Sequence, residues 1–414
     1  MSMTEPGSLS LPLSQPRPTS RWLRVLFALA ANIRVGELSV TAPNGQRHFF
    51  KGALPGPSAQ LRIHRDRAAR RLLLGGSLGF CEGYLDGDWS SQNLTALFEL
   101  ALQNEDYLDK SLDGHPWLRK ISHLFHRLKP NTRSGSKKNI AAHYDLGNDF
   151  YGRWLDPSMT YSSAIYENLA APEALESAQQ RKYEALAQRL ELKPGMHVLE
   201  VGCGWGGFAE YAARTYGVHV TGLTISPAQH AYATARIAKA GLADQVSILM
   251  CDYRDVQGEF DCIASIEMFE AVGEKYWPAY FSTLFNRLKP GGKAALQIIT
   301  IADRWFASYR RGGDYIQRYI FPGGMLPSIP VLEKETAKQG LVWQGYTPFG
   351  LHYARTLRDW NTEFQRIWPQ VRNTGKFDTR FRRLWEQYFC YCEAGFNMGT
   401  IDVIQLTLQR PQTP

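Results

Sequence analysis

The stretch Glu200-Val-Gly-Cys-Gly-Trp-Gly-Gly207 decides the fold of this chain. It directly follows residues 197–201, a short apolar run with the composition of a buried strand. Glycine tolerates the dihedral angles of a sharp turn and has no side chain to keep the backbone away from a ligand. A strand that ends in such a turn predicts an α/β sheet with a ligand-binding site at the turn.

Further short apolar runs follow the turn, separated by segments of helical periodicity, and we interpret them as buried parallel strands. These runs are residues 218–223, 246–250, 260–264 and 294–299. The first of the helices between them has a clear start signal, with Ser226 as N-cap, Pro227 at the first helical position and Gln229 completing a capping box. An antiparallel pair at one edge is expected from residues 341–346 and 403–409. The pattern predicts a doubly wound, Rossmann-like α/β sheet.

Two strand ends near the turn distinguish between nucleotide cofactors. The second strand ends in residues 222–226, Gly-Leu-Thr-Ile-Ser, without the acidic residue that nicotinamide enzymes usually place there for the ribose. The third ends in Cys251-Asp-Tyr253, and an Asp at this place suits the amino group of adenine. The pattern therefore favours S-adenosylmethionine over a nicotinamide or flavin cofactor. Because this ligand is a sulfonium cation, aromatic faces would help to hold it. Tyr161, Trp205 and Tyr253 are candidates, and the alternative for each is an ordinary core aromatic.

The composition narrows the class of protein. The six cysteines lack both the spacing of a metal site and the density of a disulfide scaffold, which predicts no metal and a reducing, cytoplasmic location. The 47 Lys and Arg against 39 Asp and Glu leave a net charge of +8, which favours an anionic partner such as nucleic acid or acidic lipid. No apolar run approaches the roughly 20 residues needed to span a bilayer. We therefore expect a protein that is soluble or peripheral to a membrane.

The chain is expected to divide into two folded domains, since 414 residues exceed what one hydrophobic core usually serves. Residues 1–19, rich in Ser, Pro and Leu, are expected to form a disordered lead-in. Residues 129–138 carry the Pro, Gly, Ser and Lys of an exposed linker. This predicts a smaller mixed α+β domain over residues 20–128 and the α/β domain over residues 139–414.

Within the first domain, the spacing predicts a helix over residues 22–30 and a hairpin over residues 33–50. The most basic segment is residues 62–71, followed directly by three leucines. It is a candidate contact with an anionic surface. The alternative is a charged face that simply lies in water.

Four motifs stand before and within the α/β pattern: His143-Tyr-Asp-Leu-Gly-Asn-Asp-Phe150, Leu155-Asp-Pro-Ser-Met-Thr-Tyr-Ser162, Val201-Gly-Cys-Gly-Trp-Gly-Gly207 and Tyr319-Ile-Phe-Pro-Gly-Gly-Met-Leu-Pro-Ser328. Together they resemble the cyclopropane-fatty-acyl-phospholipid synthase family. The resemblance runs from about residue 139 to the C-terminus. Gly79-Phe-Cys-Glu-Gly-Tyr-Leu-Asp-Gly-Asp-Trp89 is similar to the N-terminal domain of the full-length bacterial members, which the mycobacterial mycolic-acid enzymes lack. The chain therefore resembles the phospholipid-modifying branch.

The resemblance implies a class I methyltransferase that transfers a methyl or methylene group from S-adenosylmethionine to the cis double bond of an unsaturated phospholipid acyl chain, usually closing a cyclopropane ring. It implies a lipid-facing N-terminal domain, a homodimer, and work at the inner face of the membrane. The implied cofactor contacts are Tyr161, Ser162, Gly202, Gly204, Thr224, Ser226, Gln229, Asp252 and Tyr253. For Ser226 and Gln229, the alternative is that they only cap a helix.

In the family a bound bicarbonate ion removes the last proton, held by a Cys, a Glu, a His and a Tyr. The resemblance maps the Glu to Glu270 and the Tyr to Tyr353, whereas Ser163 stands at the Cys position and Gln297 at the His position. Ser and Gln still offer hydrogen bonds to an anion, so a modified bicarbonate site is one expectation. The imidazole that titrates near neutral pH is lost, and His352 is a candidate to compensate.

These departures leave the product open. If the acyl chain lost the proton in place of the new methyl group, the product would be a methyl-branched or methylene lipid, or a furan precursor. Glu267 shares the neighbourhood of Glu270 as a less secure candidate for the site. A lipid-binding member without activity is another alternative. A nucleic-acid methyltransferase would carry an Asn-Pro-Pro-Tyr or Pro-Cys motif, and neither is present, so we expect no nucleic-acid partner.

Overall fold

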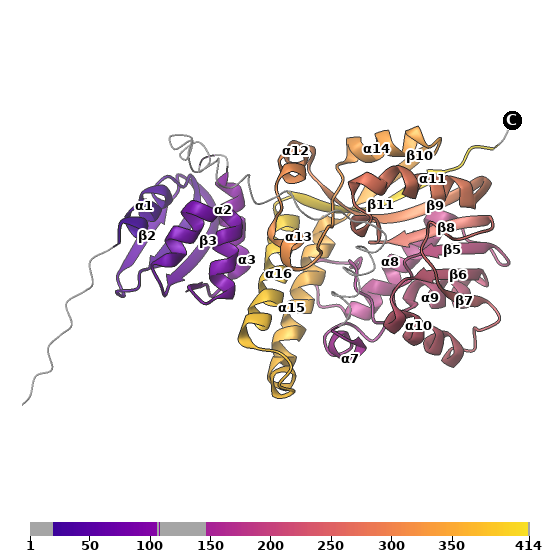
Figure 1. Ribbon diagram of the computed structural model, residues 1–414, viewed down its shortest axis with the longest axis horizontal. Helices are drawn as coiled ribbons and strands as arrows, with labels where there is room; N and C mark the ends of the chain where they lie inside the picture. Colours follow the sequence, from indigo (N-terminus) through magenta and orange to yellow (C-terminus); the bar gives the residue numbers. More distant parts are fainter. Residues whose placement is uncertain (1–19, 106, 108–145, 413–414) are drawn as a thin grey trace, which may run out of the picture.

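The computed structural model describes residues 20–105, 107 and 146–412. Within these ranges the chain forms two β-sheets with a helical hairpin between them (Figure 1). No helix in the described ranges has the length and apolar character to cross a bilayer. The expected lead-in, residues 1–19, and the expected linker, residues 129–138, lie outside the described residues.

The N-terminal part is a small mixed sheet with helices, as predicted. Its elements in chain order are α1 (Arg21–Ala30), β1 (Val35–Thr41), β2 (Arg47–Lys51), β3 (Leu54–Ile63), α2 (Arg67–Leu85), β4 (Trp89–Ser90) and α3 (Leu94–Gln103). The strands lie in the order β2-β1-β3-β4. The predicted hairpin is confirmed, because β1 and β2 pair antiparallel and Ala42 N donates to Gln46 O at 2.8 Å to close the turn.

Part of the charge of the basic segment 62–71 is used inside the protein, and its contact with an anionic surface stays a prediction. Three of its arginines converge on the side chain of Asp88, which is completely buried. Arg67 Nε lies 2.7 Å from Asp88 Oδ1, Arg65 Nη1 3.2 Å from the same atom, and Arg71 Nη1 3.0 Å from Oδ2. The segment therefore holds the start of α2 against the turn before β4.

The second part carries the predicted α/β sheet. Its strands are β5 (His197–Val201), β6 (His219–Thr224), β7 (Val246–Met250), β8 (Phe260–Ile266), β9 (Leu288–Ile301), β10 (Val342–Pro348) and β11 (Ile401–Gln409). Its helices are α7 (Asn148–Tyr151), α8 (Leu175–Leu190), α9 (Gly207–Tyr216), α10 (Pro227–Lys239), α11 (Trp277–Arg287), α12 (Asp303–Arg311), α13 (Tyr315–Tyr319), α14 (Ile329–Lys338), α15 (Gly350–Asn373) and α16 (Thr379–Asn397), with short 3-10 turns η2 (Phe269–Ala271) and η3 (Glu274–Tyr276).

The seven strands lie in the order β10-β11-β9-β8-β5-β6-β7. Strands β5 to β9 pair in parallel, and β11 lies antiparallel between β9 and β10, which confirms the predicted edge pair. The chain leaves β5 toward β6 and β7 and then returns to β8 on the other side. In open α/β sheets, ligands bind outside the carboxyl ends of the strands at such a reversal. The glycine-rich turn follows β5 at this point.

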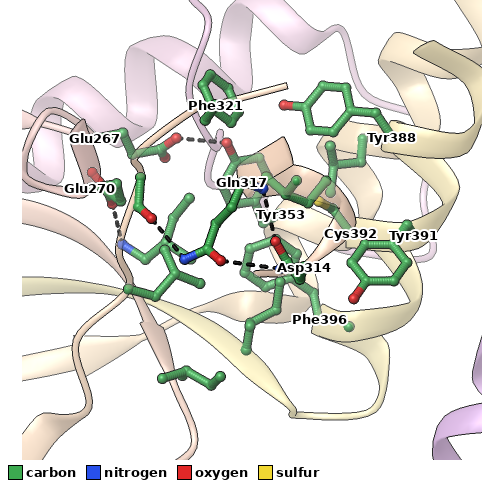
Figure 2. A pocket seen from close by; sticks show the side chains of 18 of the residues that line it. Glu267, Glu270, Asp314, Gln317, Phe321, Tyr353, Tyr388, Tyr391, Cys392 and Phe396 are labelled. Carbon is green, nitrogen blue, oxygen red and sulfur yellow. Dashed lines mark hydrogen bonds between the residues drawn. The ribbon is translucent and has the colours of Figure 1, made fainter. Parts of the chain in front are cut away.

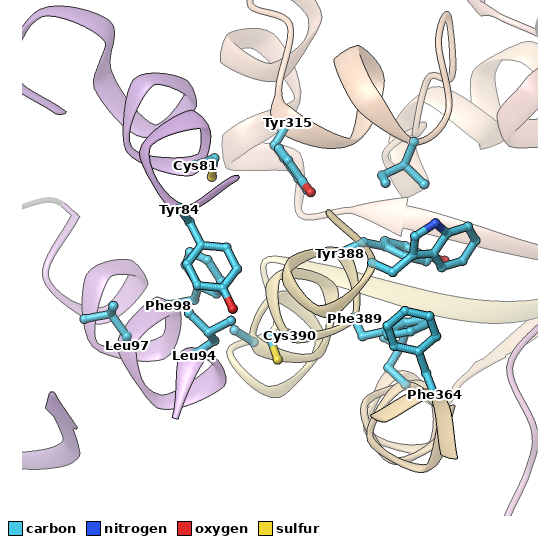
Figure 3. Close-up of a cluster of buried hydrophobic side chains, with 14 of the residues drawn as sticks. Cys81, Tyr84, Leu94, Leu97, Phe98, Tyr315, Phe364, Tyr388, Phe389 and Cys390 are labelled. Carbon is cyan, nitrogen blue, oxygen red and sulfur yellow. The ribbon is translucent and has the colours of Figure 1, made fainter. Parts of the chain in front are cut away.

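The helices α15 and α16 form the hairpin that joins the two parts. Figure 3 shows Tyr84 and Phe98 of the N-terminal part facing α16, while Phe389 on α16 faces Phe364 on α15. One buried apolar cluster runs through all these elements. Polar contacts reinforce it, since Tyr84 Oη donates to Glu386 at 2.9 Å. The N-terminal part is thus packed onto the α/β part through a continuous core.

Candidate active site

A cavity of about 1080 Å³ lies at the carboxyl ends of the parallel strands and extends to the N-terminal part. Most of the predicted site residues line it. These are Tyr161, Ser162, Gly202, Gly204, Thr224, Gln229, Asp252, Tyr253, Glu270 and Tyr353. Ser163, Ser226 and Gln297 are not among its lining residues. The sequence motifs therefore converge on one cavity, with these three residues behind its wall.

The glycine-rich turn has the conformation that its sequence predicts. Gly202 and Gly204 have φ angles of 85° and 51°, in the left-handed region that glycine tolerates best. A Cβ atom on Gly202 would lie 2.7 Å from the Met268 side chain, so the turn is tightly packed on that side. Nothing lies within 4 Å of the place where a Cβ on Gly204 would stand. This open space in the cavity wall fits a cofactor that lies against the backbone.

The residues after β6 form a small hydrogen-bonded group. Ser226 caps α10, because its Oγ accepts from Gln229 N at 3.3 Å. The predicted capping box is wrong in its second half, since the Gln229 side chain accepts a hydrogen bond from Thr224 Oγ1 at 2.9 Å. Thr224 and Gln229 line the cavity and Ser226 does not. The structure therefore favours the capping role for Ser226.

The residues after β7 contribute a carboxylate to the cavity wall. Arg254 holds Asp252 through two hydrogen bonds, from Nε to Oδ1 at 2.8 Å and from Nη2 to Oδ2 at 2.6 Å. The aromatic ring of Tyr253 packs against Tyr280, with ring centroids 5.4 Å apart. The sequence analysis did not single out Arg254. Its effect is to hold the Asp252 side chain in one orientation beside the cofactor cavity.

The Tyr161-Ser162 pair is supported by a lysine that the sequence analysis missed. Lys182 on α8 is completely buried, and its Nζ donates to Ser162 Oγ at 2.6 Å. Burial lowers the pKa of Lys182 to about 8. The signal was present in the sequence, because Lys182 stands in the helical row of Ala178, Leu186 and Leu190, where an apolar residue is expected.

Two glutamates stand at the end of β8 and beside it. Figure 2 shows Glu267 and Glu270 on the same wall of the cavity, with Glu267 turned toward Tyr353. Glu270 Oε1 accepts from Ile299 N at 2.5 Å, and its buried Oε2 has no hydrogen-bond partner within the described ranges. Burial, reinforced by the charge of Glu267, raises the pKa of Glu270 to about 8. Glu270 therefore carries a proton at neutral pH.

Glu267, the less secure candidate, turns out to be the centre of the hydrogen-bond network. Its Oε1 accepts from Ser163 N at 2.8 Å and from Gln297 Nε2 at 2.7 Å, and its Oε2 accepts from Tyr353 Oη at 2.6 Å. Gln405 orients Gln297 for this contact by donating to its Oε1 at 3.2 Å. The structure thus brings Ser163, Gln297 and Tyr353 together around the side chain of Glu267.

His352, the candidate to compensate for the missing imidazole, faces elsewhere. Its Nδ1 accepts from Tyr166 N at 3.0 Å, and it is not among the residues that line the cavity. Burial lowers its pKa, so the ring is neutral near pH 7. The structure favours a structural role for His352.

Comparisons with known proteins place this geometry in a family. The family model described as mycolic acid cyclopropane synthetase matches residues 131–406. The tuberculostearic acid methyltransferase UfaA1 of Mycobacterium tuberculosis is 41% identical over 88% of this chain and 86% of its own length. The cyclopropane-fatty-acyl-phospholipid synthase of Escherichia coli K12 is 36% identical over 85% of this chain and 88% of its own.

Solved structures agree with the sequence comparisons. The mycolic acid cyclopropane synthase CmaA1, determined with SAH and CTAB, superimposes with a TM-score of 0.61 and 32% identity, over 68% of this chain and 99% of its own. The cyclopropane synthase MmaA2 from Mycobacterium tuberculosis also gives a TM-score of 0.61, with 31% identity and the same coverage. The chain belongs to the mycolic acid cyclopropane synthetase family and is an S-adenosylmethionine-dependent methyltransferase with a class I fold.

Proposed function

We propose that this enzyme transfers the methyl group of S-adenosylmethionine to the double bond of an unsaturated phospholipid acyl chain. The observation that carries the proposal is the single cavity that joins the glycine-rich turn to an apolar lining from the N-terminal part. That lining includes Leu72, Leu74, Phe80, Leu97 and Phe98. An acyl chain is the kind of ligand that such a lining accommodates, because apolar walls favour it over water.

The two ends of the cavity suit the two reactants. Bound S-adenosylmethionine supplies an electrophilic methyl group on a sulfonium. The open space at Gly204, the held carboxylate of Asp252 and the hydroxyl of Ser162 are the features of this chain that would hold the cofactor. The aromatic wall formed with Tyr161 and Tyr353 excludes water from the double bond and offers its faces to a cation.

The main product we propose is a cyclopropane fatty acid, which is the product named for the Escherichia coli relative. A second candidate is a methyl-branched or methylene acyl chain. The tuberculostearic acid methyltransferase relative supports it, together with the serine and glutamine at positions 163 and 297. Both products begin with the same methyl transfer. Proton loss from the new methyl group closes the ring, proton loss from the chain leaves a methyl-branched alkene, and a hydride shift to the charged carbon followed by proton loss from the methyl group leaves a methylene group.

The function is tested by incubating the enzyme with methyl-labelled S-adenosylmethionine and vesicles of dioleoylphosphatidylglycerol. We expect label in the lipid, and NMR of the product then distinguishes a ring from a branch or a methylene group. Vesicles with fully saturated chains are the matched control and should stay unlabelled. Label on saturated chains, or none on oleoyl chains, would contradict the proposal.

We further propose that the enzyme works as a peripheral protein at the anionic inner face of the membrane, and that α12 faces the lipid. This helix carries exposed Arg304 and Arg311 and a half-exposed Trp305, the mixture that suits a lipid headgroup layer. Both Trp305 and the leucines before Gly76, where α2 kinks, line the cavity. We place the entrance for the acyl chain between these two helices.

A homodimer remains a prediction, which analytical ultracentrifugation would test.

Reversing charge on α12 should weaken binding to anionic vesicles. Each basic residue near an anionic surface contributes about 1 kcal/mol. The double variant Arg304→Glu/Arg311→Glu should therefore lose at least about tenfold in vesicle affinity, measured by cosedimentation at low salt. Added salt should weaken wild-type binding as well, because exposed charges are screened over about 10 Å at 0.1 M.

The control for this experiment is Arg366→Glu/Arg372→Glu, on the end of α15 that Figure 1 places away from α12. It makes the same change in net charge and should bind vesicles like the wild type. Equal losses of vesicle affinity in the two double variants would show that binding depends only on net charge. The proposal that α12 faces the lipid would then be wrong.

A further inference from the structure

We propose that the carboxylate of Glu267 is a built-in base that takes the place of bicarbonate in this enzyme. The inference rests on the methyl transfer proposed above and assigns its last proton transfer. Three of the four positions that the family resemblance assigns to the bicarbonate site donate hydrogen bonds to this one side chain. The fourth, Glu270, lies close enough for the charge of Glu267 to act on it.

The hydrogen-bond donors that would hold a bicarbonate ion are already bonded to Glu267. A carboxylate and a bicarbonate ion are both planar anions that accept hydrogen bonds through two oxygens. In this chain Glu267 Oε1 already accepts from Ser163 N and Gln297 Nε2, and Oε2 accepts from Tyr353 Oη, all within 2.8 Å. The residues present therefore do not fit a separate anion at this place.

The two departures at positions 163 and 297 fit the same conclusion. Gln297 is held with its amide nitrogen toward Glu267, because Gln405 Nε2 donates to its oxygen. Position 163 contributes its backbone N–H, since the Ser163 hydroxyl donates to Ala164 O at 3.1 Å. A glutamine and a backbone amide suffice to hold a carboxylate that is already tethered to the chain.

The backbone at Glu267 is the second sign of a functional position. Its φ angle is 50°, a strained conformation that residues other than glycine rarely adopt. Such strain gathers at active sites, where the surrounding structure imposes it. The strained turn directly after β8 brings the Glu267 side chain to the cavity wall, beside Tyr353 (Figure 2).

Burial and the hydrogen-bond donors around Glu267 act on its pKa in opposite directions. Burial raises its pKa, while the hydrogen bonds from Tyr353, Ser163 and Gln297 and the positive charge of Lys182 act in the opposite direction. Glu270 keeps its own proton, because its pKa lies at about 8. Three donors converge on the Glu267 carboxylate, whereas in the described ranges only Ile299 N donates to Glu270, so the hydrogen-bond pattern places the negative charge of the pair on Glu267.

The reaction balances with Glu267 as the acceptor. The electron pair of the double bond forms the new bond to the methyl carbon as the sulfur–methyl bond breaks, which leaves a positive charge on the other alkene carbon. A C–H bond of the new methyl group then gives its proton to the Glu267 carboxylate, and the electrons of that bond close the ring. Glu267 returns the proton to water, and the net products are the modified lipid, the thioether and one proton.

Two variants test the assignment on the full-length protein. Glu267→Gln keeps the size of the side chain and removes its basicity, so turnover of dioleoylphosphatidylglycerol vesicles should fall at least about 100-fold, with S-adenosylmethionine affinity retained. Glu267→Gly suits the positive φ angle and opens a space lined by the three donors. This variant should gain binding of labelled bicarbonate in equilibrium dialysis, which the wild type should lack, and bicarbonate should restore part of its activity.

The outcomes separate the two proposals. The wild type should keep full activity in buffer freed of carbon dioxide, and a loss that bicarbonate reverses would overturn the inference while supporting the function. Full activity in Glu267→Gln would also overturn it. If the wild type labels no unsaturated lipid, the proposed function fails, and the bicarbonate-binding comparison between wild type and Glu267→Gly still decides whether Glu267 fills the anion site.

Discussion

Replacing Glu270 with glutamine should lower turnover by about 100- to 10,000-fold, the range in which positioned acids and bases act, and leave S-adenosylmethionine affinity within a few fold. At pH 7 Glu270 is protonated, because burial and the charge of Glu267 raise its pKa to about 8. Glutamine therefore resembles the neutral form of the side chain in charge and size. Glutamine has no acidic O–H group, so it cannot exchange a proton with Glu267 when Glu267 returns the proton of the reaction to water.

The pH dependence of folding stability distinguishes a catalytic role of Glu270 from a structural one. The pKa of Glu270 is higher in the folded protein than in the unfolded chain, so the folded state binds the proton more tightly, and this contribution is lost as pH rises from about 4.5 through about 8. Glu270→Gln removes this loss of stability at high pH, because glutamine does not ionise. The variant should therefore match the wild type at pH 5 and melt a few degrees higher at pH 9, since about 1 kcal/mol shifts a domain of this size by roughly 2–4 °C.

The measurements are initial rates of S-adenosylhomocysteine release, calorimetric S-adenosylmethionine binding, and melting curves at the two pH values. Glu259→Gln is the matched control, because this exposed carboxylate pairs only loosely with Arg410 at 3.3 Å. It should behave as the wild type does throughout. A Glu270→Gln variant with wild-type turnover would remove this residue from proton transfer, and a variant that melts lower at both pH values would make its role structural.

Most of the sheet could be predicted from the sequence, because its signals are local. The apolar run before the glycine turn matches β5 residue for residue, and Ser226 caps the helix that follows β6. The capping box failed in its second half because Thr224 competes for the Gln229 side chain. The predicted antiparallel edge pair also formed, as β11 lies between β9 and β10.

The parts that could not be predicted depend on contacts between distant residues. The place of Glu267 at the centre of the site follows from hydrogen bonds to residues 163, 297 and 353, which only the fold brings together. Lys182 carried a signal in its apolar helical row, but its partner Ser162 is set by the fold. The basic run 62–71 has the composition of a solvated surface, and the sequence does not indicate that Asp88 lies buried among its arginines.

Replacing Asp88 with asparagine should destabilise the N-terminal part by about 1.5–3 kcal/mol, the range for hydrogen bonds to a charged group, because Asp88 is buried while its arginine partners stay partly exposed. The Asp88 side chain is completely buried and accepts from Arg65, Arg67 and Arg71. Asparagine keeps the shape but removes the charge that Arg65 and Arg67 pair with, and among the described residues it leaves Arg71 paired only with Asp86. Urea unfolding followed by tryptophan fluorescence would measure the loss, because Trp89 is the next residue along the chain and is buried.

Asp86 supplies the control two residues earlier. Its half-buried carboxylate pairs with Arg71 at 2.8 Å and Arg380 at 3.3 Å, and such accessible pairs contribute about 1 kcal/mol or less. Asp86→Asn should therefore cost less than Asp88→Asn. Equal costs for the two variants would mean that the number of arginine partners, and not the burial of Asp88, sets the stability of this segment.

The Asp88 variant also probes how the N-terminal part serves the reaction. Asp88 ties down the start of α2, and Leu72 and Phe80 on the same helix line the acyl end of the cavity, whereas the cofactor end is built by the α/β sheet. Loosening α2 should therefore raise the lipid KM at temperatures where the protein stays folded and leave S-adenosylmethionine affinity unchanged. A loss of cofactor affinity in step with lipid turnover would show that the two ends of the cavity form one cooperative unit.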